Sequence, residues 1–441
     1  MLPKDERQRI IDLIKREVVP AIGCTEPIAV ALCTAQATEL LGYTPEKISL
    51  QLSANILKNA MGVGIPGTGM IGLPIAIALG ALIGKSEYQL EVLRDCTPEA
   101  VELGKRFIDE GRINITLKEH ISEKLYIEVL CEANGHQSEA IIATGHTNFV
   151  FLKKGEEILV DKRIKEPSNS HEIGETKNLQ ESESLTLTLR KVFDFATTTP
   201  IDEIEFILEA RRLNKAAAEE SFKIDYGHGL GRAIREPMET PVVGDSIFAH
   251  ILAYTSGACD ARMAGAMIPV MSNSGSGNQG ISATMPVVVY AEDTHKSEEQ
   301  MIRALILSHL TVIYIKQSLG RLSALCGCVV AATGSSCGIT YLMGGSYEQV
   351  AYAVKNMIAN ITGMICDGAK PSCAMKVTSG VATAVFSALL AMQQKCVTAC
   401  EGIIDEDVDQ CIRNLTRIGA QGMNETDRLV LDIMTHKTGR C

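Results

Sequence analysis

The stretch ICDGAKPSC places Cys366 and Cys373 on either side of a glycine and a proline. Three more cysteines lie in the earlier stretch LCGCVVAATGSSC: Cys326, Cys328 and Cys337. An iron–sulfur cluster takes thiolate ligands from backbone that curves around it, and glycine and proline allow such a curve. The short paired spacing of a zinc site is missing and no histidine stands nearby, which favours iron–sulfur chemistry over zinc. Small cysteines packed between close helices explain the spacing equally well, so both interpretations stay open.

A further cysteine, Cys24, stands at the expected start of a helix in AIGCTEPIAVALC, with Thr25 and Glu26 in the first turn. The N-terminus of a helix lowers the pKa of a thiol, so we expect Cys24 to supply a thiolate as base or nucleophile. Cys33 lies deeper in the same helix among apolar residues, and we expect it to be an ordinary core residue.

Two glycine-rich loops are candidate substrate cradles. SANILKNAMGVGIPGTGM presents Lys58 and Asn59 before its glycines, and MSNSGSGNQGISATMP contains Ser274 and Asn278. Exposed backbone N–H groups in such loops bind carboxylates or phosphates. Neither loop matches the phosphate-loop or dinucleotide pattern, and tight turns are the alternative explanation for both. His146 in TGHTN follows a predicted strand and is a weaker candidate, because a lone histidine is more often structural.

The elements that must hold these residues fall into three parts. Residues 1–89 predict the helical N-terminal part of the catalytic body, with Cys24, a short strand in KISLQLS and a glycine loop. Residues 90–184 predict one helix, TPEAVELGKRFIDEG, then alternating strands in antiparallel hairpins and an exposed polar loop. Residues 185–441 show helical periodicity with many small residues, which indicates close helix packing. The predicted fold class is therefore α+β, a mainly helical catalytic body with a small antiparallel-sheet insertion.

Composition narrows the possible partners. The 441 residues include 53 acidic and 42 basic side chains, with a net charge of -11 and 4% aromatic residues, which argues against nucleic acid. The N-terminal segment is an amphipathic helix pattern without a secretory signal, so we expect a cytoplasmic protein whose 14 cysteines stay reduced. The uncharged stretch 60–84 is long enough to span a bilayer, but we expect a loop followed by a buried helix over 70–83, with a membrane carrier as the minor alternative.

Five stretches in this order, GCTEPIAVAL, NILKNAMGVGIPGTG, TGHTN, SNSGSGNQG and CDGAKPSCAMK, together resemble the L-cysteine desulfidase family across nearly the whole chain. That family is related to the iron–sulfur-dependent L-serine dehydratases. The resemblance implies cleavage of L-cysteine to pyruvate, ammonia and sulfide with a [4Fe–4S] cluster and no pyridoxal phosphate. L-serine dehydratase is the alternative with the same mechanism. A zinc-stabilised binding module is a rival from another class, and close-packed small-residue helices make a homodimer reasonable.

Carried over by position, the resemblance implies that Cys24 is the catalytic base and that three cysteines hold the cluster: Cys326, Cys366 and Cys373. Cys328 and Cys337 compete as the first ligand, and the terminal Cys441 is a further candidate. Three thiolates leave one iron open as a Lewis acid for the leaving group or carboxylate. The backbone of GVGIPGTG is expected to help hold the amino acid, together with six side chains: Thr25, Lys58, Asn59, His146, Ser274 and Asn278.

Overall fold

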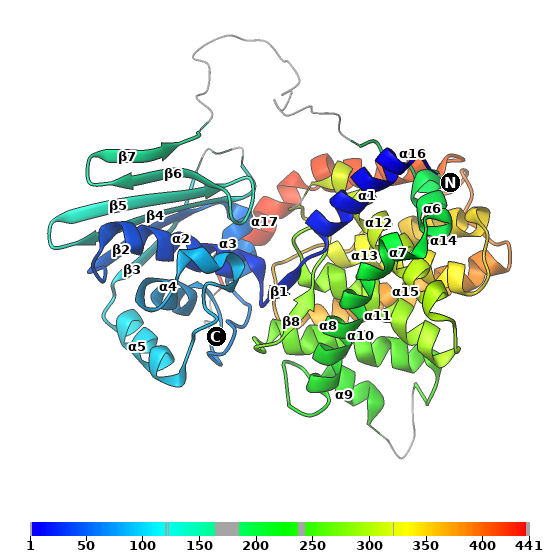
Figure 1. Ribbon diagram of the computed structural model, residues 1–441, viewed down its shortest axis with the longest axis horizontal. Coiled ribbons are helices and arrows are strands. Elements are labelled where there is room, and N and C mark those ends of the chain that lie inside the picture. Colours follow the sequence, from blue (N-terminus) through cyan, green and yellow to red (C-terminus); the bar gives the residue numbers. More distant parts are fainter. Residues whose placement is uncertain are drawn as a thin grey trace, which may run out of the picture.

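The computed structural model describes residues 2–119, 121, 123–163, 185–236, 243–320 and 322–437. It is α+β, as the sequence predicts: a small sheet with helices lies beside a larger helical body (Figure 1). Most of the predicted polar loop, residues 164–184, and the terminal Cys441 lie outside the described residues.

The larger sheet has six strands in the order β3-β2-β4-β5-β6-β7. Its strands are β2 (Lys47–Leu52), β3 (Ile113–Leu117), β4 (Tyr126–Ala133), β5 (His136–Ala143), β6 (Phe149–Lys154) and β7 (Glu157–Asp161). The run from β4 to β7 is antiparallel, which confirms the predicted hairpins. The pair of β2 and β3 is parallel, because a crossover of helices separates these strands along the chain.

The helical elements that accompany the sheet are α2 (Thr25–Leu41), α3 (Ala54–Ala60), α4 (Leu73–Leu82), the short turn η1 (Ser86–Glu91) and α5 (Pro98–Asp109). Helix α5 begins as predicted, since the Thr97 side chain accepts a hydrogen bond from the Ala100 N–H. Helix α4 follows the glycine loop and is buried along most of its length, which confirms the predicted core helix. Helix α2 packs on β4 and β5, and its Cys33 is fully buried as expected.

The helical body contains the remaining elements. They are α1 (Lys4–Glu17), α6 (Leu189–Thr198), α7 (Ile201–Ile204), η2 (Glu205–Ile207), α8 (Leu208–Ser221), α9 (Leu230–Arg235), α10 (Ile247–Met263), α11 (Gly277–Asp293), α12 (Glu298–Leu319), α13 (Gly327–Leu342), α14 (Tyr347–Ile361), α15 (Cys373–Met392), α16 (Val408–Arg417), η3 (Ile418–Gly422) and α17 (Asn424–Thr435). A short antiparallel pair, β1 (Pro20–Ile22) with β8 (Pro269–Met271), joins the N-terminal segment to this body.

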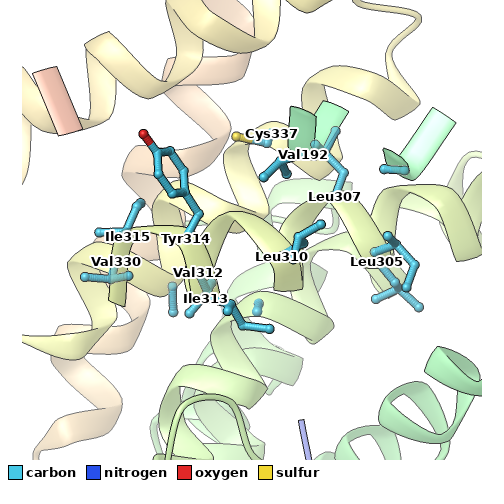
Figure 2. Packing of buried hydrophobic residues seen from close by; sticks show 14 of the residues in the cluster. Val192, Leu305, Leu307, Leu310, Val312, Ile313, Tyr314, Ile315, Val330 and Cys337 are labelled. Carbon is cyan, nitrogen blue, oxygen red and sulfur yellow. The ribbon is translucent and has the colours of Figure 1, made fainter. Parts of the chain in front are cut away.

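The centre of the body is α12, which is apolar around most of its circumference, as expected of a helix enclosed by others. Figure 2 shows Leu305, Leu307 and Leu310 of α12 packed against neighbouring helices. Small residues let α13 approach closely: a Cβ at Gly334 would lie 2.5 Å from the Ser308 carbonyl oxygen of α12. The small residues in the predicted helices therefore do mark close packing.

One described helix, α15, is long and apolar enough to cross a membrane by length and composition, and half of its apolar window is buried in the fold. It packs against α10, α13 and α14, as core helices of globular proteins also do. The stretch that raised the membrane alternative, 60–84, contains only the short helix α4. The predicted domain boundaries after residues 89 and 184 stay predictions; strand β2 of the first part lies between β3 and β4.

Candidate active site

One cavity of about 100 Å³ brings together residues that lie far apart in the sequence, from Cys24 to Val377. It is lined by Cys24, Thr25, Glu26, Asn59, Arg262, Ser276, Asn278, Gln279, Cys326, Gly327, Cys328, Cys366, Gly368, Ala369, Cys373, Lys376 and Val377. Cys24, the three predicted cluster cysteines and three of the predicted substrate-binding residues therefore face one space.

The pairing of β1 with β8 explains how distant segments meet here. The antiparallel register sets Pro20 beside Met271, and the Ser272 N–H continues the pairing to the Val19 carbonyl at 2.9 Å. The SNSGSGNQG loop then contacts the start of α2, where the Thr25 hydroxyl donates to the Gly275 carbonyl at 2.9 Å. Gly280 is needed where α11 crosses β8, because a Cβ there would lie 1.9 Å from the Met271 carbonyl oxygen. The loop then begins α11, with the Ser276 side chain accepting a hydrogen bond from the Gln279 N–H.

A second short pairing brings the two cysteine groups together. The Cys326 N–H donates to the Met364 carbonyl at 2.9 Å, and the Cys366 N–H donates to the Ala324 carbonyl at 2.6 Å. Cys373 follows at the first residue of α15, after a turn in which Gly368 has φ of +88°. Adjacent backbone at Cys326 and Cys366 and a tight turn before Cys373 therefore present all three thiols to the cavity.

Cys328 and Cys337, the two alternatives to Cys326 as the first cluster ligand, lie in different parts of the structure. Cys328 lines the cavity, and its Sγ lies 3.3 Å from Cys326 Sγ. Cys337 is fully buried in the helical core, where its Sγ lies 3.3 Å from the Thr333 carbonyl oxygen, and it does not line the cavity. Cys328 thus remains beside Cys326 as a possible first ligand.

Local charge favours thiolate at one of these positions. The hydrogen bond between the Cys326 and Cys328 sulfurs lowers the pKa of Cys326 to about 7 despite its burial, and Lys376 and Lys370 add to this effect. Burial raises the pKa of Cys366 to about 11 and also raises that of Cys373. Two lysines beside several thiols would offset the negative charge that thiolate ligands bring.

The donor set fits an iron–sulfur cluster. Cysteine thiols are the ligands that such clusters take, and the backbone around them bends at glycine and proline. Among the described residues, no three His, Cys, Asp or Glu side chains converge closely enough to hold a single metal ion. A cubane spreads its thiolates over different irons, so cysteines around a cavity suit it better than they suit one zinc ion.

Cys24 is held differently from the prediction. The helix start is confirmed, since Cys24 precedes α2 directly as its N-terminal cap. The predicted lowering of its pKa is wrong: burial raises the pKa of the Cys24 thiol well above its usual value, the Glu26 charge raises it further, and Arg262 offsets this only in part. The thiol is 2% exposed and donates to Glu26 Oε2 at 3.0 Å.

Glu26 is the acidic centre of this side of the cavity. Burial alone would raise its pKa, but the neighbouring charge of His146, the hydrogen bond from Cys24 and the charge of Arg262 hold the pKa below the usual value. The Asn59 side chain donates to Glu26 Oε1 at 3.2 Å. The buried carboxylate therefore accepts from both the candidate base and a predicted substrate-binding residue.

Arg262 is a buried cation on the cavity wall. Its side chain belongs to a residue that is 3% exposed and donates from Nε to the Gly23 carbonyl at 3.1 Å and from Nη1 to Asn278 Oδ1 at 2.9 Å. Two neighbouring amide oxygens, Asn59 Oδ1 and Gln279 Oε1, are buried without a hydrogen-bond partner. A cation and two acceptors therefore face the same space.

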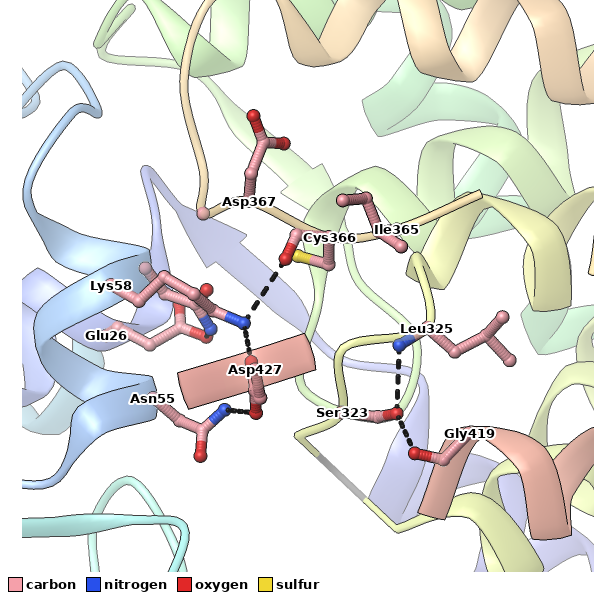
Figure 3. Close-up of polar contacts among 12 residues, drawn as sticks. Glu26, Asn55, Lys58, Ser323, Leu325, Ile365, Cys366, Asp367, Gly419 and Asp427 are labelled. Atoms are coloured by element: carbon pink, nitrogen blue, oxygen red, sulfur yellow. Dashed lines mark hydrogen bonds and ion pairs between the residues drawn. The ribbon is translucent and has the colours of Figure 1, made fainter. Parts of the chain in front are cut away.

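Three predicted substrate-binding residues lie off this cavity. Lys58 is 1% exposed and pairs with Asp427 of α17, while its Nζ donates to the Cys366 carbonyl (Figure 3). Ser274 donates to Asn273 Oδ1 at 2.8 Å. His146 lines a second cavity. The glycines of GVGIPGTG also lie elsewhere, with Gly64 packed against Ala264 at the end of α10.

Sequence reasoning missed Glu26, Arg262, Gln279 and Lys376 as lining residues. The available signal was a charged side chain within a run of small or apolar residues, as for Arg262 in GACDARMAG. Such a charge is buried only if it meets a partner or a ligand. Glu26, next to Thr25, is likewise a charged side chain within a run of small or apolar residues.

The family described as serine dehydratase alpha chain matches residues 87–432. A UPF0597 protein of Bacteroides fragilis is 73% identical over 436 residues, which covers 99% of this chain and 100% of the relative. UPF0597 proteins of Porphyromonas gingivalis and Aeromonas hydrophila are 57% and 43% identical, covering 98% and 97% of this chain and 99% and 96% of the relatives.

The chain belongs to the serine dehydratase alpha chain family. This confirms the predicted kinship with L-serine dehydratases and supports a serine dehydratase-like lyase. The narrower prediction, L-cysteine desulfidase, concerns which amino acid is the substrate.

Proposed function

We propose that the protein is an iron–sulfur-dependent lyase that converts L-cysteine to pyruvate, ammonia and hydrogen sulfide. The observation that carries the proposal is the shared cavity, where Cys24 and Glu26 face the wall formed by Cys326, Cys366 and Cys373. One wall offers ligands for an electrophilic cofactor, and the other offers groups that move a proton. A β-elimination needs both.

The residues that would hold the cofactor are Cys326, Cys366 and Cys373, with Cys328 as the alternative to Cys326. A [4Fe–4S] cluster bound there would supply an iron that acts as a Lewis acid on the leaving group. Lys376 and Lys370 would balance part of the charge of the thiolates.

An amino acid suits the polar groups on the cavity wall. The buried Arg262 side chain donates to two neutral oxygens, and the nearby Glu26 charge offsets part of its own charge, so an anion within hydrogen-bond reach would stabilise it further. A substrate carboxylate does so by a charge-assisted hydrogen bond. The free oxygens of Asn59 and Gln279 can accept from the substrate ammonium. Asn278 holds the guanidinium in place.

Cys24 is the group proposed to take the α-proton. Its thiol must first give up its own proton, which the hydrogen bond to Glu26 Oε2 allows. The Cα–H bond then breaks, the electron pair expels the β-substituent, and the aminoacrylate product reacts with water to give pyruvate and ammonia. The sulfur leaves as sulfide.

Serine is the second candidate substrate, and the family match favours it. Hydroxyl and thiol leaving groups both suit a Lewis-acid iron, so the same cavity serves either reaction. The protein purified without oxygen should be assayed for sulfide release from L-cysteine and for pyruvate formation from L-serine. A larger kcat/KM for cysteine supports the desulfidase. A larger value for serine assigns the dehydratase instead, and activity with neither refutes the proposal.

A homodimer in the cytoplasm remains part of the proposal. Large apolar side chains are exposed along α15, among them Phe386, Leu389 and Leu390, and such a stripe suits a second copy of the chain. Sedimentation equilibrium of the isolated protein would show twice the chain mass, whereas a single chain mass at all concentrations would contradict the dimer.

A further inference from the structure

We infer that Glu26 passes the proton of Cys24 to a second cavity lined by His146, from which it reaches solvent. The inference rests on the proposed function, because it concerns the proton that Cys24 must lose before it can act as the base. It assigns Glu26 as a proton carrier and His146 as the group that receives the proton on the far side.

The second cavity has a volume of about 300 Å³. The segment after β5 contributes Thr144, Gly145, His146, Thr147 and Asn148 to its wall. The remaining wall comes from the end of α1 and the chain that leads into and through β1, from Thr25, from Leu90 of η1 and from the SNSGSGNQG loop. Several polar side chains line it, so the space suits water.

Thr25 lines both the first and the second cavity, so it forms the wall that they share. Its hydroxyl donates to the Gly275 carbonyl at 2.9 Å and lies 3.1 Å from Glu26 Oε2. Glu26 itself lines the first cavity, and His146 lines the second. The Glu26 carboxylate thus lies next to Thr25, the residue between the two cavities.

Hydrogen bonds hold the Glu26 carboxylate where it can exchange a proton with the Cys24 thiol. Cys24 Sγ lies 3.0 Å from Oε2, and Asn59 fixes Oε1 at 3.2 Å. Three ionisable groups lie close enough to the carboxylate to lower its pKa: Cys24 at the start of its own helix, His146 from the loop after β5, and Arg262 from α10. All three are buried, so bulk water does not reach Cys24 directly.

The proton steps balance without a further reactant. The Cys24 S–H bond breaks as an O–H bond forms on Glu26, and that proton then moves to the His146 imidazole and to water in the second cavity. The Cys24 S–H bond forms again as the substrate Cα–H bond breaks and the sulfur leaves as HS⁻, whose charge balances the proton released to water. The aminoacrylate takes up one proton at its β-carbon and loses one from its nitrogen when it rearranges, so net charge is conserved.

Chemical rescue tests this route. His146→Ala should lower kcat for cysteine by about 10-fold or more, in line with the loss of one acid–base group. Added imidazole should restore much of the loss, because the second cavity gains room for it. His136→Ala, an exposed histidine at the start of β5 that lines neither cavity, is the matched control and should behave as wild type. Iron content and thermal unfolding should match wild type in both variants.

A second measurement needs no turnover. The infrared S–H stretching band of Cys24, identified by its absence in Cys24→Ser, should move to higher frequency in cofactor-free Glu26→Gln, because a carboxylate accepts a stronger hydrogen bond than an amide. Unchanged kcat in His146→Ala, or a loss that imidazole does not reverse, would overturn the inference. An unmoved S–H band would do the same. An inactive, iron-free wild type would instead refute the proposed function.

Discussion

Cys24 shows at the scale of one residue how burial can outweigh a helix terminus. The sequence places it at the start of a helix, where a thiol should ionise easily. The folded chain buries it beside Glu26, and its pKa rises. The position could be predicted from sequence, but the protonation state could not, because it depends on a carboxylate and a guanidinium brought in by other contacts.

Cys24→Ala should abolish turnover while leaving the cluster in place. The thiol is the only proposed base, and loss of a base costs about 10²–10⁴-fold in rate. Turnover and iron content are measured on the same anaerobic sample. Cys33→Ala, in the same helix but in the core, is the control and should keep both activity and iron. Full activity in Cys24→Ala would exclude Cys24 as the base.

Arg262→Gln should raise KM for the amino acid by about 10–100-fold, because a charge-assisted hydrogen bond contributes roughly 1.5–3 kcal/mol. Arg262→Lys keeps the charge and should recover part of the affinity. The decisive comparison uses a substrate amide, which lacks the carboxylate: its weak binding should not change in Arg262→Gln. If both ligands lose affinity equally, Arg262 does not bind the carboxylate.

Short pairings between elements build the site. Most helices and strands could be predicted from the sequence, because they show periodicity and carry signals such as Thr97 and Pro98 at a helix start. Two short pairings could not be predicted: that of β1 with β8 and that of Leu325 with Ile365. Each involves few residues and has no sequence pattern of its own. Yet the first pairing fixes the segment before Cys24 against the strand that leads into the SNSGSGNQG loop, and the second aligns Cys326 with Cys366.

His309 of α12 holds one of these loops. Its Nδ1 accepts from the Asn273 side chain at 3.0 Å, and its Nε2 donates to Thr284 Oγ1 at 3.0 Å, so the ring is neutral. Burial lowers the pKa of His309 from 6.5 to about 3. Between these values the unfolded chain binds a proton that the folded chain does not, so stability falls as pH drops from 6.5 towards 3.

The pH dependence of unfolding checks this. The His309 contribution should be about 1.4 kcal/mol per pH unit in that window, and His309→Gln should flatten the slope even though it lowers stability at every pH. Equal slopes in wild type and His309→Gln would contradict the assignment.

Across the whole molecule, the C-terminal helix ties the sheet side to the cysteine loops. Asp427 of α17 binds both Lys58 and Asn55 of α3, and Lys58 also reaches the Cys366 carbonyl (Figure 3). Figure 1 shows α17 running from the helical body towards α3. The loop next to Lys58 led us to predict from the sequence that Lys58 binds substrate. In the structure Lys58 pairs with Asp427, which lies 369 residues away along the chain, and no local sequence pattern reveals such a pair.

Asp427→Asn should destabilise the protein by about 3–5 kcal/mol, because it leaves the Lys58 ammonium buried without its counter-ion. Denaturant unfolding measures the change. Asp432→Asn, on the exposed part of the same helix, should have little effect. The double variant Lys58→Met, Asp427→Leu removes both charges and should recover most of the stability. A double variant as unstable as Asp427→Asn would contradict this explanation.

The measurement that tests the central claim most directly is the iron and acid-labile sulfide content of protein purified without oxygen, wild type beside Cys366→Ala. The account predicts about four irons and four sulfides per wild-type chain and a colourless, iron-free variant. Cys96→Ala, a partly exposed cysteine away from the cavity, should keep the wild-type content. Zinc or no metal in the wild type, or undiminished iron in Cys366→Ala, would contradict the account.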